Sequence, residues 1–253
     1  MNENFIQFTH FNPSIAKHCF TTRRGGVSNG CFKSMNMGYN RGDNADNVRK
    51  NYEVVCDFLN VDPARLAFTN QVHGKEIRVV GESDFNGGYA PRTCDAIMTD
   101  QPNITLVSFY ADCVPLFFLD PVRKVIALAH AGWRGTLLEI GAETVKRMVF
   151  EYGSEPTNIK AGIGPSIGKC CFEVGDEVAD AFTEKYEKFV INKGQGKFMV
   201  DLWGINVEIL SAAISPKNIE LSNICTKCNP NDFFSHRNMG AERGSMASFI
   251  TLV

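Results

Sequence analysis

The chain has 253 residues, of which 44% are hydrophobic and 21% are charged, and this composition excludes a disordered or fibrous protein. Its 26 basic and 28 acidic residues give a formal net charge of −2, which argues against a protein that mainly coats nucleic acid or an anionic membrane. No segment approaches the ~20 apolar residues of a membrane span, and residues 1–10 lack the pattern of a signal peptide. We therefore expect a cytoplasmic protein, a monomer or weak homo-oligomer, with no nucleic-acid or membrane partner.

The first part of the chain predicts one helix followed by two short strands. Apolar residues such as Val48 and Tyr52 recur at helical spacing across residues 44–60. Residues 66–70 and 76–80 are short apolar stretches of strand length.

The centre of the chain is the most apolar region. Thr136 with Glu139 matches a capping box, which predicts a helix that starts there and ends near Gly153. Three runs of strand length precede this helix, and they cover residues 104–110, 114–119 and 125–129.

The last part adds helices and two further strands. Strands are expected at 159–163 and 247–253, and helices at 178–189 and 202–213. Because the strands cluster instead of alternating strictly with helices, we expect an α/β fold in which helices pack outside a mixed sheet. No linker or repeat divides the sequence, so we interpret residues 1–253 as a single domain.

Polar residues at predicted strand ends are candidates for chemistry. His73, Cys113 and His130 each follow or end an apolar stretch, where loops on a rigid sheet usually carry function. Two imidazoles, one thiol and an open fourth position are typical of a catalytic zinc site. Their separations of 40 and 17 residues fit no compact finger motif, and a lone Cys or His is more often a core or surface residue.

Other polar motifs can be interpreted either as functional or as ordinary structural residues. Asp112 is a candidate to orient an imidazole or a water, or to transfer a proton. The segment 22–28 offers guanidinium groups for an anion such as phosphate, or is a plain turn.

Nine scattered cysteines do not indicate a disulfide framework. The CxxC at 225–228 and the Cys170-Cys171 pair are more typical of ordinary thiols than of a metal or redox site.

The motifs in combination resemble the YfiH/YlmD laccase-domain family, also known as a purine nucleoside phosphorylase family. They occur here as Phe20-Thr-Thr-Arg23 with Gly-Gly-Val-Ser28, Gln71-Val-His73-Gly, Ala111-Asp-Cys113-Val-Pro, His130-Ala-Gly-Trp-Arg-Gly-Thr136, Gly164-Pro-Ser-Ile167 and Phe234-Ser-His236-Arg237. This resemblance implies a single YfiH-like α/β domain with one zinc ion on His73, Cys113 and His130. It also implies phosphorolysis of adenosine, inosine and S-methyl-5′-thioadenosine, and hydrolytic deamination of adenosine.

The resemblance and the motifs together give a set of site residues. We expect catalytic roles for Cys113, Asp112 and His130. Binding of the nucleoside and of phosphate is assigned to Arg23, Ser28, Gln71, Arg134 and Arg237. Near the C-terminus the family usually has Thr-Gly-Arg where this chain has Arg243-Gly244-Ser245, so Arg243 is a candidate to replace the family's arginine. His236 stands where a Tyr is common in the family.

Two other activities compete with this interpretation. A multicopper laccase needs several coppers and many imidazoles, whereas this chain has five His, so copper at the zinc site would give only incidental oxidation. A cysteine hydrolase that edits peptidoglycan precursors would use Cys113 as nucleophile and His130 as base. Chelators should abolish a zinc activity and spare a thiol one. A third interpretation, a non-enzymatic binding module, would hold only if the protein had neither bound metal nor catalytic turnover.

Overall fold

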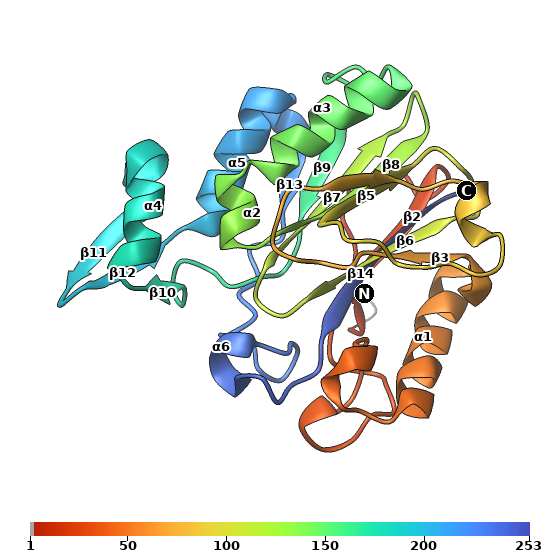
Figure 1. Ribbon diagram of the computed structural model, residues 1–253, viewed down its shortest axis with the longest axis horizontal. Coiled ribbons are helices and arrows are strands. Elements are labelled where there is room, and N and C mark those ends of the chain that lie inside the picture. Colours follow the sequence, from red (N-terminus) through yellow and green to blue (C-terminus); the bar gives the residue numbers. More distant parts are fainter. Residues whose placement is uncertain (1–2) are drawn as a thin grey trace.

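The computed structural model describes residues 3–253, and its strands form two large sheets and one small sheet (Figure 1). The five-stranded sheet has the order β1-β2-β14-β6-β3, and the six-stranded sheet has the order β13-β9-β7-β8-β5-β4. The small sheet, β10-β12-β11, lies with α4 at one end of the molecule, at the left of Figure 1.

The elements have the following bounds. The five-stranded sheet contains β1 (Phe5–Ile6), β2 (Ala16–Thr21), β3 (Leu66–Phe68), β6 (Thr105–Tyr110) and β14 (Met246–Leu252). The six-stranded sheet contains β4 (Ile77–Val79), β5 (Ala96–Thr99), β7 (Val114–Asp120), β8 (Val125–Ala131), β9 (Lys160–Ile163) and β13 (Ile219–Leu221). The small sheet contains β10 (Glu173–Val174), β11 (Val190–Gly194) and β12 (Lys197–Val200). The helices are α1 (Ala45–Leu59), α2 (Trp133–Leu137), α3 (Ile140–Tyr152), α4 (Asp176–Tyr186), α5 (Leu202–Ala213) and α6 (His236–Met239).

The two large sheets pack against each other, and helices cover their outer faces. Along β7, Leu116 and Phe118 belong to the apolar cluster under α3 and α5, whereas Phe117 and Leu119 belong to the cluster between the sheets. Because both faces of β7 are buried, its sequence is a continuous apolar run instead of an alternating one. On the far side, α1 packs on the outer face of the five-stranded sheet. Among residues 3–253, no helix combines the length and apolar character that crossing a membrane requires.

The α/β class with helices outside mixed sheets is confirmed, but the strands divide into three sheets instead of one. The expected helix start at Thr136 is wrong. Helix α2 begins at Trp133, ahead of Thr136. Glu139, whose φ is 54°, separates α2 from α3, which begins at Ile140. The Thr136 hydroxyl contacts the carbonyl of Ala131 at 3.4 Å, so it does not cap a helix.

Candidate metal centre

Three metal-ligand side chains meet where the two large sheets are connected. His73 lies in the loop after β3, Cys113 in the turn that leads from β6 to β7, and His130 in β8. The ligand atoms of the three residues all lie within 4.8 Å of one another, and His73 Nε2 is 3.9 Å from Cys113 Sγ. The fold therefore brings together three residues that stand far apart in the sequence.

A buried carboxylate, Asp95, holds two parts of this triad. Its Oδ1 lies 2.9 Å from Nδ1 of His130, so Nε2 is the ring nitrogen left to face the other two ligands. The same carboxylate accepts backbone N–H bonds from Val72, His73 and Gly74 at 3.1, 3.0 and 2.8 Å. These bonds fix the loop that carries His73, whose φ of 61° lies in the left-handed region.

Asp95 was not predicted from the sequence, because one Asp before a short strand carries no spacing signal. Antiparallel pairing of β5 with β8 sets Ala96 opposite Ala129, and the carbonyl of Asp95 accepts the N–H of His130 at 2.7 Å. The role of Asp95 thus follows from strand register.

The charges in the triad support one another. Burial disfavours the thiolate of Cys113, yet the imidazoles of His130 and His73 outweigh burial and lower the pKa of Cys113 to about 6. Burial also disfavours the charged form of His130 and would lower its pKa, but the Cys113 thiolate and Asp95 outweigh burial and raise this pKa. Burial raises the pKa of Asp95, and its hydrogen bonds from His130 and Gly74 outweigh that effect and lower it.

This donor set fits a single zinc ion. A thiolate and two imidazoles are ligands that zinc favours, and three protein ligands leave a fourth position for a reactant. The carboxylate behind His130 is the partner that metal-bound histidines commonly have. Gly132 lines the same centre, since a Cβ there would lie 2.8 Å from the His73 ring and 3.3 Å from the Cys113 sulfur.

Asp112 contacts hydroxyl and backbone donors. Its Oδ1 accepts a bond of 2.6 Å from Thr226, and its Oδ2 accepts bonds from Ser235 and from the backbone N–H of Arg237 at 3.0 and 2.7 Å. Asp95 instead of Asp112 is thus the carboxylate that orients an imidazole. The contacts of Asp112 anchor two C-terminal segments beside Cys113.

Four of the five expected substrate residues, Arg23, Ser28, Gln71 and Arg237, make internal hydrogen bonds. Arg23 donates to the carbonyls of Lys33 and Pro230 and lies 4.5 Å from the ring centroid of Phe234. The Ser28 hydroxyl, 3% exposed, accepts a bond from Asn51. Gln71 exchanges two hydrogen bonds with the backbone of Phe109. The bonds of Arg23 join loops to one another, that of Ser28 joins a loop to α1, and those of Gln71 join a loop to β6. They give these three residues a structural task.

The other arginines differ in their surroundings. Arg134 is exposed and lies 4.2 Å from the ring centroid of Trp133. Arg237 donates to the carbonyls of Cys171 and Glu173.

Arg243 is buried, and within residues 3–253 its Nε has no hydrogen-bond partner. Burial and the nearby Arg41 lower the pKa of Arg243 to about 10, while the charges of Asp112 and Cys113 raise it. A buried guanidinium with an unused donor therefore lies in the electrostatic field of the triad.

The chain is similar in sequence and in fold to known proteins. A family model described as "Multi-copper polyphenol oxidoreductase laccase" matches residues 17–253. The chain is 37% identical over 240 residues to a Bacillus subtilis protein named purine nucleoside phosphorylase YlmD, covering 91% of this chain and 86% of the relative. It is 35% identical over 249 residues to a purine nucleoside phosphorylase of Bacteroides thetaiotaomicron, covering 94% and 92%. The crystal structure of Bacillus licheniformis YfiH superposes with a TM-score of 0.90 at 35% identity and covers 98% of this chain and 99% of that one.

Proposed function

Because this chain belongs to the YfiH/YlmD laccase-domain family, we propose that it is a purine nucleoside phosphorylase that also deaminates adenosine. Its substrates are adenosine, inosine and S-methyl-5′-thioadenosine with phosphate, and its products are the free base and the sugar 1-phosphate. In the second reaction, water replaces the amino group at C6 of adenosine, and inosine and ammonia leave.

The observation that carries this proposal is the convergence of His73, Cys113 and His130 within 4.8 Å. These three residues would hold one zinc ion, which supplies Lewis-acid chemistry when it is bound. Asp95 holds His130 through Nδ1 and fixes its ring orientation, so this histidine would bind the ion through Nε2.

Arg243 is the best candidate to bind phosphate. Its unused Nε suits a phosphate oxygen, and a buried charge-assisted bond is stronger than one in water. In phosphorolysis an oxygen of the held phosphate forms a bond to C1′ of the sugar while the C1′–N9 bond breaks and its electron pair leaves with the purine. The internal contacts of Arg23 support this assignment, as does the exposure to solvent of Arg134 and Arg237.

The competing activities have less support. Within the described residues, the groups of three or more possible metal ligands are this triad and a cluster of four cysteines, so imidazoles for several coppers are lacking. Copper in place of zinc would be a substitution in one site. The names of the relatives favour phosphorolysis over a cysteine hydrolase.

Product analysis tests the proposal. The full-length protein, with its zinc content measured, is incubated with adenosine or with inosine, each with and without phosphate. We expect adenine or hypoxanthine only with phosphate, and inosine from adenosine in both cases. Cys113→Ser should abolish both reactions, whereas Cys31→Ser, which changes an exposed cysteine elsewhere, should not. Full turnover by folded Cys113→Ser protein would refute the proposal.

A further inference from the structure

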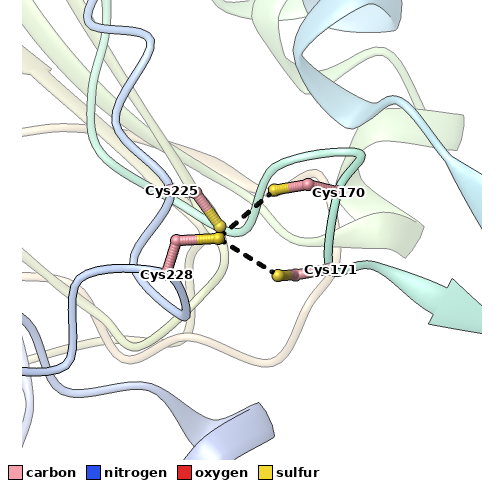
Figure 2. Close-up of side chains that lie close together, drawn as sticks. All are labelled: Cys170, Cys171, Cys225 and Cys228. Carbon is pink, nitrogen blue, oxygen red and sulfur yellow. Dashed lines mark hydrogen bonds between the residues drawn. The ribbon is translucent and has the colours of Figure 1, made fainter.

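A second group of possible metal ligands lies outside the triad. Cys170 and Cys171 precede β10, and Cys225 and Cys228 lie between β13 and α6. Figure 2 shows the two pairs turned toward each other from separate loops. The Cys228 sulfur is 3.5 Å from that of Cys170 and 3.4 Å from that of Cys171, and all four sulfurs lie within 4.8 Å of one another. The sequence alone indicated two unrelated pairs of ordinary thiols.

The spacing of the sulfurs fits one tetrahedral ion. Four thiolates at a Zn–S distance of about 2.3 Å stand about 3.8 Å apart, which lies within the observed range. An iron–sulfur cluster must fit several irons and sulfides between its thiolates, so it needs a wider opening. We propose that Cys170, Cys171, Cys225 and Cys228 bind one zinc ion through four thiolates, at a site separate from His73, Cys113 and His130.

The backbone arranges both cysteine pairs for this purpose. Ser166 and Cys225 form a parallel β-bridge, in which Ser166 N–H donates to Ile224 and Thr226 N–H donates to Ser166. The N–H of Gly168 points at the Cys225 sulfur at 3.3 Å. An N–H donor of this kind stabilises a metal-bound thiolate in the way that outer partners support ligands elsewhere.

The position of the cluster assigns a structural task to the ion. Four protein ligands close the coordination sphere, which is typical of structural zinc. The ion would join the loop before β10 to the loop before α6. Thr226, between two of the cysteines, donates to Asp112, and the N–H of Ile167 donates to the Asp112 carbonyl. The cluster thus supports the segments that position the residue next to Cys113.

Metal binding by the full-length protein tests this site without any need for turnover. Cys113→Ser disrupts the triad and leaves all four cysteines in place. We expect this variant, kept reduced, to retain one equivalent of zinc after dialysis, and cobalt(II) in its place to give the intense absorption of a tetrahedral tetrathiolate complex. Further replacement of Cys228 by Ser should remove that equivalent, whereas further replacement of Cys31 should not.

Three results would overturn the proposal. They are failure of the reduced Cys113→Ser protein to bind zinc or cobalt, recovery of iron with acid-labile sulfide, and a disulfide among the four cysteines in protein purified under reducing conditions. None of them depends on nucleoside turnover, so the proposed function and the second zinc site can fail separately. If Cys228→Ser does not fold, the cobalt spectrum of Cys113→Ser still decides the question.

Discussion

Asp95 and His130 form a buried pair in which a carboxylate oxygen lies 2.9 Å from Nδ1 of the imidazole. Replacing Asp95 by Asn removes the charge that orients the ring, and it puts an amide group against three backbone N–H donors. Loss of such an outer partner typically weakens metal binding about 10–100-fold. We expect a loss of this size for Asp95→Asn, measured by competition with a chromophoric chelator.

Asp120→Asn is the matched control, because Asp120 is as buried as Asp95 but lies far from the triad along β7. Asp120 is the last residue of this strand, whereas Cys113 precedes its first residue. Within residues 3–253, the partners of its Oδ1 are the nearby N–H groups of Val122 and Arg123. Zinc affinity should be unchanged in this variant. Wild-type affinity in folded Asp95→Asn protein would show that the pair does not organise the centre.

Two substitutions of Asp112 can distinguish a proton-transfer role from a positioning role. It accepts three hydrogen bonds from the C-terminal segments, so we expect Asp112→Ala to lower the free energy of unfolding by about 1–3 kcal/mol. We expect Asp112→Asn to keep the pH dependence of kcat, because Asn tolerates its φ of 83° and retains an acceptor oxygen. A loss of about 10²–10⁴-fold in kcat with a shifted pH profile would instead identify a proton-transfer role.

The strand ends that carry the triad were readable from the sequence, since apolar runs such as 104–110 end abruptly in polar residues. β7 and β8 were predicted almost to their ends because both of their faces are buried. β2 was missed. Its sequence, Ala-Lys-His-Cys-Phe-Thr, has no clear alternation, and it becomes a strand by antiparallel pairing with β14 from the other end of the chain.

Side-chain partners set by long-range pairing were the least predictable part. Asp95 meets His130 through the register of β5 and β8. The cysteine pairs meet because a bridge between Ser166 and Cys225 aligns two distant loops. Neither contact produces a pattern in the local sequence, so each residue taken alone resembles an ordinary surface or core residue.

Arg243 should determine the affinity for phosphate if phosphorolysis takes place in this site. Arg243→Gln removes a buried charged donor, and we expect the KM for phosphate to rise about 10–100-fold with a smaller change in the KM for inosine. Arg243→Lys should recover part of the loss, since it restores the charge but not the Nε donor. The measurement is the initial rate of hypoxanthine formation at varied phosphate.

Arg134→Gln serves as the comparison, because Arg134 is exposed and stacks on Trp133. Its KM for phosphate should change less than that of Arg243→Gln. The reverse order, with a wild-type value for Arg243→Gln, would transfer phosphate binding to Arg134.

His18 should make the protein sensitive to acid. The residue is 3% exposed, and its Nε2 accepts the N–H of Phe8 at 2.7 Å, so the neutral form is the one that fits. Burial lowers the pKa of His18 from 6.5 to about 4, and the charge of Glu220 opposes this only in part. Below pH 6.5 the unfolded chain therefore binds a proton that the folded chain does not, and folding stability falls as the pH falls.

At pH 4.5 this difference costs about 2.5 kcal/mol relative to pH 7, at about 1.4 kcal/mol for each pKa unit. His18→Gln should not have this loss of stability, because Gln does not bind a proton in this pH range and its side-chain oxygen can still accept the Phe8 N–H. Urea unfolding at the two pH values should therefore show a smaller acid-induced loss for His18→Gln than for wild type. His10→Gln is the comparison variant, because it removes a partly exposed histidine 3.9 Å from Glu220 and leaves His18 in place. Equal losses in His18→Gln and wild type would mean that His18 already accepts a proton in the folded state.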